Sequence, residues 1–253
     1  MKRAIDAPRP ARNAIVALGL TLALTCAATA PGRAGASELL GGWEGDNFAQ
    51  GYAFLGAGRL LPVSDRMTIP VRLSASYLYY DFREAGTTAR VTSPGLTLLA
   101  GPRYSCARGS LTLLAGAEVR REHREPGAAA ATWETVPGAV GQVEADCGLA
   151  PRWRGTLLAN YAGAARYVFT RGALRWQATN PSWSGPTTLV LGLEGTGQGN
   201  DESRSGEAGA VLDLSFVPQK LSLAVRGGYK DAWSPGAEHR RGIYFGLGFY
   251  RRF

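Results

Sequence analysis

The chain has 253 residues, a formal net charge of +8 and a hydrophobic content of 45%. Much of the positive charge lies in the first thirty-six residues, which hold five basic side chains and one acid, so the remaining 217 residues carry +4 (8 − 5 + 1). This length and modest charge indicate one domain with no nucleic-acid partner. No later stretch is apolar enough for a transmembrane helix, so any membrane crossing would use strands.

Residues 1–36 have the organisation of a cleavable secretory signal peptide. A basic segment precedes an apolar run over residues 14–30, and the triplet Ala34-Gly35-Ala36 offers a small-x-small cleavage site. The alternative is an uncleaved anchor, but the run is shorter than the roughly 20 apolar residues that span a bilayer. We therefore expect cleavage before Ser37 and an exported domain over residues 37–253.

The exported part has the texture of an all-β protein. It is rich in Gly, Tyr, Trp, Leu and Val, and Pro and Gly clusters interrupt it at regular intervals. Apolar and polar residues alternate over 69–79, 111–120 and 221–230, so that in each segment one face is apolar and the other is charged. The pattern predicts antiparallel strands with two chemically distinct faces.

Two architectures fit such strands, and they differ in which face is the inside. In a soluble sandwich the apolar face would be the core, whereas in a membrane barrel it would face lipid and the charges would line a wet lumen. The segments are ten to sixteen residues long, and a tilted membrane strand needs about 9 to 11. Aromatic residues also gather near strand ends, as in a membrane-interface girdle. We therefore predict a single antiparallel transmembrane β-barrel.

The last strand strengthens this prediction. From Gly242 to the terminal Phe253 apolar residues occupy alternate positions. The pattern resembles the C-terminal signal by which outer-membrane barrels are recognised for assembly, with Arg251 as a departure near its end. The residues of the expected assembly signal are Phe245, Leu247, Phe249 and Phe253. Membrane lipid and the barrel assembly machinery are accordingly expected partners, and the outer membrane is the expected location.

The pattern predicts about twelve strands, with ten as an alternative, and both chain ends of an even-stranded barrel lie in the periplasm. Tight or proline-containing connections are expected at the periplasmic rim, and polar, glycine-rich ones at the cell surface. The predicted strands are 40–46, 50–61, 67–82, 91–104, 110–124, 133–148, 153–168, 170–178, 187–196, 206–216, 220–231 and 241–253.

Reactive groups are sparse. His123 and His239 are far apart and begin no metal-ligand spacing, so we expect no metal site, no cofactor and no catalytic residues. Cys106 and Cys147 fall near the same rim of the predicted barrel, and a disulfide between them and two free thiols both remain open at this point.

Charged residues of both signs form the other group of candidate functional residues. They could pair across a narrow barrel and brace its wall, or form a mildly cationic passage or polysaccharide-binding lumen. The candidate lumen-lining residues are Arg72, Arg103, Glu118, Arg120, Glu144, Asp146, Arg154, Arg166, Arg171, Arg175, Glu194, Glu207, Asp213, Arg226 and Lys230.

Several segments together resemble the BcsS family of outer-membrane proteins associated with bacterial cellulose biosynthesis. The opening Gly42-Trp43-Glu44-Gly45 with Gly51-Tyr52-Ala53-Phe54-Leu55-Gly56-Ala57 looks like the family's first hairpin, and residues 110–118 are similar to its central strand. Residues 166–172 and the stretch from Gly192 to Gly242-Ile243-Tyr244 extend the resemblance over nearly the whole exported chain. Val168-Phe169 and Leu193 depart from the family pattern.

The resemblance implies a non-catalytic, accessory role in making, exporting or anchoring cellulose, with cellulose or components of its synthase complex as partners. Exposed aromatic residues could stack on sugar rings, although a membrane girdle also explains them. These residues are Tyr79, Tyr80, Trp133 and Trp233. The alternatives are a general small-solute channel unrelated to cellulose and, from another class, a lipid-modifying outer-membrane enzyme.

Overall fold

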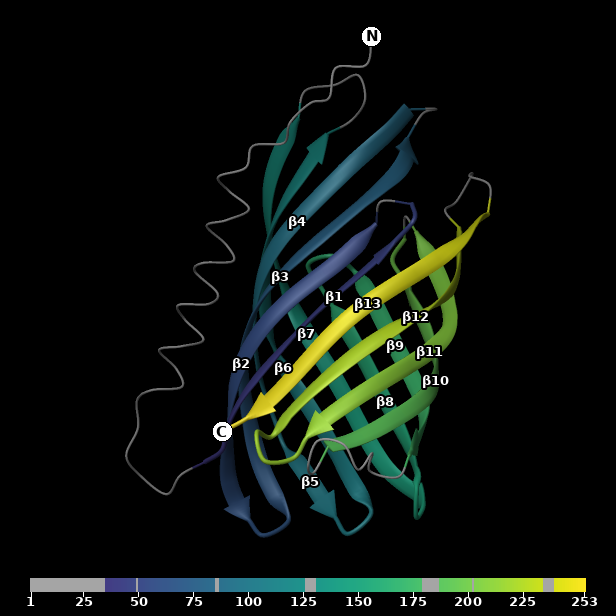
Figure 1. Cartoon of the computed structure of the whole chain (residues 1–253). Helices are drawn as coiled ribbons and strands as arrows, with labels where there is room; N and C mark the ends of the chain where they lie inside the picture. Colours follow the sequence, from purple (N-terminus) through teal and green to yellow (C-terminus); the bar gives the residue numbers. More distant parts are fainter. Residues whose placement is uncertain are drawn as a thin grey trace.

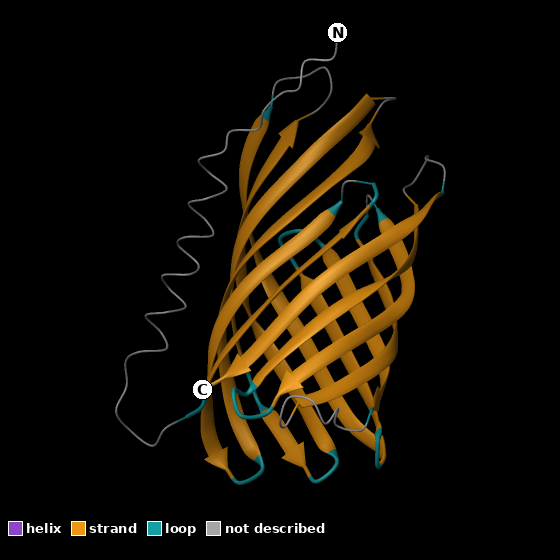
Figure 2. Cartoon of the chain, viewed as in Figure 1, coloured by secondary structure: helices purple, strands orange, loops and turns teal. Residues whose placement is uncertain are grey.

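A computed structural model describes residues 35–48, 50–84, 87–125, 131–178, 187–201, 203–233 and 239–253. These residues form strands joined by turns and loops (Figure 2). The strands are β1 (Ser37–Asp46), β2 (Gly51–Ser64), β3 (Met67–Glu84), β4 (Thr87–Ala100), β5 (Arg103–Cys106), β6 (Gly109–Glu125), β7 (Thr132–Ala150), β8 (Trp153–Ala162), β9 (Tyr167–Gln177), β10 (Thr187–Gly199), β11 (Arg204–Phe216), β12 (Leu221–Trp233) and β13 (Arg240–Arg252).

The strands close into a barrel (Figure 1). Each strand pairs antiparallel with its neighbours, β13 pairs with β1, and β2 pairs with β3 to complete the ring. The short β5 continues β4, because both lie between β3 and β6 and only Gly101-Pro102 separates them. Pro102 has no N–H to give to a ladder, which explains the interruption. The ring thus has twelve strand positions, which confirms the predicted twelve-strand barrel.

The largest error in the predicted strand boundaries lies at the turn between β8 and β9. The sequence predicted strands over 153–168 and 170–178, but β8 ends at Ala162 and a turn precedes β9 at Tyr167. Arg166 closes this turn in a left-handed conformation with φ of 48°, and its N–H donates to the carbonyl of Gly163 at 3.3 Å. Arginine seldom adopts that conformation, so Gly163 at the start of the turn was the one local turn signal.

The barrel is apolar outside and polar inside. On β10 and β13 the outward residues Leu193 and Ile243 are 71% and 67% exposed, whereas Glu194 of β10 is only 5% exposed and points inward. Among the described residues, Leu99, Leu114 and Val140 form a small cluster of buried apolar side chains inside the barrel. A closed barrel satisfies its own backbone hydrogen bonds, so such an outer face suits hydrocarbon and such an interior suits water.

The two ends of the barrel differ in their connections. The lower rim in Figure 1 carries the C-terminus, where the N–H of Phe253 donates to the carbonyl of Ser37 at 2.9 Å, and the connections from β2 to β3, β5 to β6, β7 to β8 and β11 to β12. The opposite ends of these strands lie at the upper rim. There β3, β4, β6 and β7 rise above the neighbouring strands, because β2 pairs with β3 only up to Tyr79 and β8 pairs with β7 only from Val140. We call this part the projecting sheet.

Within the part of the chain that the structure describes, no helix is long and apolar enough to cross a membrane.

Candidate functional site: a divided polar lumen

Three cavities follow one another along the inside of the barrel. The upper cavity has a volume of about 70 Å³ and lies near the upper rim, where Tyr80 and Ser203 line it. The middle cavity measures about 340 Å³. The lower cavity, of about 390 Å³, is lined near the lower rim by Arg154 and Tyr250. Consecutive cavities share lining residues, so they form one divided lumen.

Two groups of side chains mark the divisions. Tyr52 of β2 and Tyr167 of β9, with Gln198 of β10, line both the upper and the middle cavity. Phe54 of β2 and Arg226 of β12 line both the middle and the lower cavity. Aromatic, amide and guanidinium groups therefore stand where consecutive cavities adjoin.

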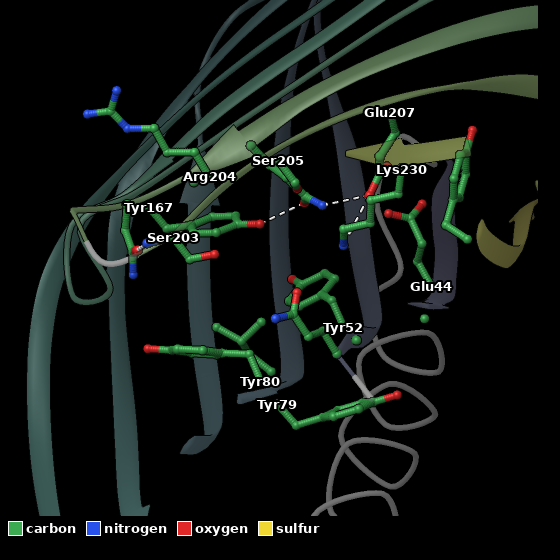
Figure 3. A pocket seen from close by; sticks show the side chains of 18 residues that line it. Glu44, Tyr52, Tyr79, Tyr80, Tyr167, Ser203, Arg204, Ser205, Glu207 and Lys230 are labelled. Carbon is green, nitrogen blue, oxygen red and sulfur yellow. Dashed lines mark hydrogen bonds and ion pairs between the residues drawn. The ribbon is translucent and has the colours of Figure 1, made fainter. Parts of the chain in front are cut away.

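A hydrogen-bonded row runs along the wall of the upper cavity over neighbouring strands (Figure 3). The hydroxyl of Tyr167 donates to Gln198 at 2.6 Å, and the amide of Gln198 donates to Glu207 at 2.9 Å. The ammonium of Lys230 lies 3.3 Å from the same Glu207 carboxylate and 2.8 Å from Asp46 of β1. Phenol, amide, carboxylate and ammonium groups from five strands, β9 to β12 and β1, thus form one network.

Ion pairs in the middle cavity reach across the interior. Arg72 of β3 pairs with Glu144 of β7, three positions around the ring. Arg171 of β9 pairs with Glu44 of β1, five positions away. Such bridges join strands that share no backbone hydrogen bonds, and therefore tie opposite parts of the wall together.

Other pairs join closer strands. In the middle cavity Arg72 also binds Glu38 of β1, and Arg120 lies 3.1 Å from Glu118 on the same strand. Near the lower rim, Arg175 lies 2.6 Å from Asp213, and Arg154 pairs with Asp146.

The strand register places fourteen of the fifteen candidate lumen residues on inward positions of the wall. Arg103 is among them and donates to Ser110 at 3.3 Å. The exception is Arg166, whose side chain is 78% exposed in the β8–β9 turn and lies 3.9 Å from Asp201. Arg166 lies in this turn because β8 ends at Ala162, before the predicted end of the strand.

The aromatic residues of the lumen were not predicted from the sequence. Tyr52 and Phe54 are inward on β2, and Tyr167 and Phe169 are inward on β9. The ring order places β9 six positions from β2 in either direction, so the two pairs face each other from opposite walls. Strand alternation could have revealed Tyr52 and Phe54, since they share a face with Gly56 and Gly58, but apolar residues were expected to face lipid.

The cysteines and histidines lie outside the lumen. Cys106 and Cys147 are free thiols, because each pairs with Gly109 from opposite sides of β6. Two strand spacings of roughly 4.8 Å put their Cα atoms about 10 Å apart, beyond disulfide reach. His123 stacks on Trp133 with ring centroids 4.1 Å apart. His239 stacks on Trp233 at 6.3 Å.

Among the described residues, no group of three or more His, Cys, Asp and Glu side chains is arranged to hold a metal ion.

The family model described as cellulose biosynthesis protein BcsS matches residues 43–253. The chain belongs to the BcsS family. The resemblance that the first hairpin and the later glycine and aromatic positions suggested is thereby confirmed. None of the curated proteins matches this BcsS member.

Solved structures resemble this BcsS barrel in fold. The β domain of the Bordetella autotransporter BrkA has a TM-score of 0.54 at 15% identity, over 87% of this chain and 99% of that one. The translocator domain of the autotransporter NalP from Neisseria meningitidis has a TM-score of 0.49 at 16% identity, over 96% of each chain. The transport unit of AIDA-I from Escherichia coli has a TM-score of 0.49 at 12% identity, over 98% of this chain and 100% of that one. The likeness to BrkA shows that the fold is that of an outer-membrane barrel.

Proposed function

We propose that this barrel is a non-catalytic accessory component of bacterial cellulose biosynthesis that serves the export of the glucan or its anchoring at the cell surface. The observation that carries the proposal is a lumen holding three adjoining cavities in a member of the BcsS family. A glucan is neutral and covered with hydroxyl groups, so a route for it needs hydrogen-bonding groups without a strong field of one sign.

The lumen supplies such groups along its length. Its arginines and acids are largely paired with each other, as Arg175 is with Asp213 and Arg120 with Glu118. Amide and hydroxyl groups such as those of Gln142 and Ser215 stand between the pairs. Paired charges brace the wall and still offer oxygen and nitrogen atoms to a passing hydroxyl group. Membrane lipid, the barrel assembly machinery, and cellulose or components of its synthase complex are the partners that this role requires.

The test is a deletion of the gene in the strain that encodes this chain. Total cellulose, and cellulose retained on washed cells, would be measured in the deletion strain and after complementation with the wild-type gene. The proposal is supported if the deletion strain loses surface-retained cellulose and complementation with the wild-type gene restores it. Unchanged amounts in both fractions would refute it.

A second function is favoured by the same cavities. A general small-solute channel would also need a polar lumen, and the adjoining cavities follow the barrel from one rim towards the other. Planar-bilayer recordings of the purified protein separate the two. A steady ion conductance that glucan fragments leave unchanged, together with a deletion that leaves cellulose unaltered, would favour the channel.

A further inference from the structure

We propose that the middle cavity is a saccharide-binding site in which a neutral pyranose ring lies between the aromatic pair of β2 and the aromatic pair of β9. The inference deepens and rests on the proposed function, because it names the part of the lumen that recognises the glucan. The volume of about 340 Å³ falls within the range of roughly 300 to 1,000 Å³ that small-molecule sites occupy.

The aromatic pairs supply the two flanking surfaces. Tyr52 and Phe54 stack on each other with ring centroids 5.9 Å apart and planes 25° from parallel, which presents two rings along one wall. On the opposite wall, the guanidinium of Arg171 lies over the ring of Phe169, 4.9 Å from the ring centroid. Tyr167 is held by its hydrogen bond to Gln198. Aromatic faces favour the C–H face of a sugar ring, and these four are positioned before any ligand arrives.

The polar lining between the pairs suits hydroxyl groups. Gln142 donates to Glu144 at 2.6 Å and accepts from Asn160 at 3.2 Å. Asn160 uses one of its two N–H groups in that bond, so its amide keeps further hydrogen-bonding capacity towards the cavity that it lines. Ser74 and Thr97 add hydroxyl groups from β3 and β4.

The charge of the cavity argues for a neutral ligand. Four arginines and three glutamates line it (Arg72, Arg120, Arg171 and Arg226, with Glu44, Glu118 and Glu144). Glu38 lies against Arg72 and Glu194 against Arg171, so the formal sum over these groups is −1 (4 − 3 − 2). Each guanidinium lies at most 3.9 Å from a carboxylate. A site for an ion would present unpaired charge of one sign, and this cavity instead offers compensated charge with aromatic faces.

Binding to the purified, detergent-folded barrel tests the site directly. Isothermal titration would compare cellotetraose with maltotetraose, which has the same sugar in another linkage, and with the anionic tetragalacturonate. We expect cellotetraose to bind more tightly than tetragalacturonate. The variants Phe54→Leu and Phe169→Leu keep apolar volume but lose the aromatic face. We expect the Kd for cellotetraose to rise about threefold in each and about tenfold in the double variant.

Phe245→Leu is the matched control, because Phe245 faces outward on β13 and is 46% exposed. Its Kd should equal that of the wild type. An undetectable affinity of the wild type for cellotetraose, a wild-type Kd in the double variant, or tighter binding of tetragalacturonate would each overturn the proposal. Maltotetraose binding as tight as that of cellotetraose would overturn linkage recognition by this cavity and with it the link to cellulose.

A second measurement does not depend on the folding of the aromatic variants. Ser74→Cys, made in a Cys106→Ser and Cys147→Ser background, places one thiol in the middle cavity. Saturating cellotetraose should slow its reaction with a charged methanethiosulfonate at least threefold, and an unchanged rate would contradict the site. The outcome is separable from the cellular test. If the gene deletion lowers cellulose but the purified barrel binds no glucan, only the proposed site is refuted. If the purified barrel binds glucan but the deletion leaves cellulose unchanged, only the proposed function is refuted.

Discussion

Arg171 of β9 and Glu44 of β1 form an ion pair through the lumen, although five strand positions separate them around the ring. Both side chains are largely buried, at 15% and 17% exposure. Glu44 also lies 3.9 Å from Arg226, so it joins β1, β9 and β12. The lumen is therefore crossed by a charged bridge where the middle cavity meets the upper one.

Replacing one partner of this bridge should destabilise the barrel. Arg171→Met leaves the largely buried carboxylate of Glu44 with the more distant Arg226, and a largely buried polar group that loses its partner costs about 1 to 3 kcal/mol. We expect a lower urea midpoint of unfolding, measured by the tryptophan fluorescence of the protein in detergent. The double variant with Glu44→Gln should lose less than the sum of the two single losses.

Asp201→Asn provides the control for that experiment. Asp201 pairs with Arg166 at 3.9 Å, with side chains 81% and 78% exposed, and such pairs contribute about 0 to 1 kcal/mol. Equal midpoint shifts for Arg171→Met and Asp201→Asn would show that the bridge through the lumen does not brace the barrel.

A charge on the outer face should be costly in a lipid-dependent way. Leu193 is the middle residue of β10 and is 71% exposed on the outside of the barrel. Leu193→Arg should lower the free energy of unfolding in lipid vesicles by about 2 to 4 kcal/mol, whereas Leu193→Met should change it little. An arginine variant as stable as the methionine variant would contradict a lipid-facing position.

The terminal strand should control assembly in cells. Deletion of Phe253 removes the end of the expected assembly signal while β13 keeps its pairing with β1 from Arg252 upward. We expect several-fold less heat-modifiable barrel in the outer-membrane fraction. Leu193→Ala, a truncation of another outward apolar residue, should assemble normally. Normal yields after deletion of Phe253 would remove it from the signal.

The cysteines of the exported protein should remain reduced. Cys106 and Cys147 lie on opposite sides of β6 and are exposed. A thiol assay on the denatured, unreduced protein should therefore find two thiols per chain, and reducing agent should leave gel mobility unchanged. Fewer than two thiols, with a mobility change on reduction, would indicate a bridge and a different register of β5.

The start of the exported protein is a separate prediction. Mass spectrometry of the barrel purified from outer membranes should give a chain that begins at Ser37. Ser37 already takes part in the lower rim, where its carbonyl accepts from the N–H of Phe253 at 2.9 Å. A mature chain that retains residues 1–36 would refute cleavage at this site.

The sequence was sufficient to predict the barrel and its two faces. Strict alternation in the segment from Ile69 to Tyr79 was enough to place Arg72 inside and Val71 outside, because side chains in a strand alternate by necessity. The ladder between β3 and β4 keeps this register without a break. Such periodicity is local, so it could be read without knowing which strands are neighbours.

Prediction of the contacts inside the lumen requires information that is not local in the sequence. Nothing in the sequence around Arg171 singles out Glu44, which lies 127 residues away, because pairing through the lumen depends on strand count and register together. The aromatic residues of β9 were missed for a related reason. The turn before Tyr167 contains no proline or asparagine, and an error in its position reassigns the residues that follow.

The projecting sheet differs from the closed ring in having a strand edge without a described partner strand. Above the ring, the outer edge of β7 has backbone groups without a strand partner among the described residues, since pairing with β8 begins at Val140. An open edge invites pairing with another copy of the chain. Pro137 lies on this stretch and has no N–H to offer, and Glu134 adds a charge. We expect Pro137 and Glu134 to hinder edge-to-edge pairing between neighbouring barrels.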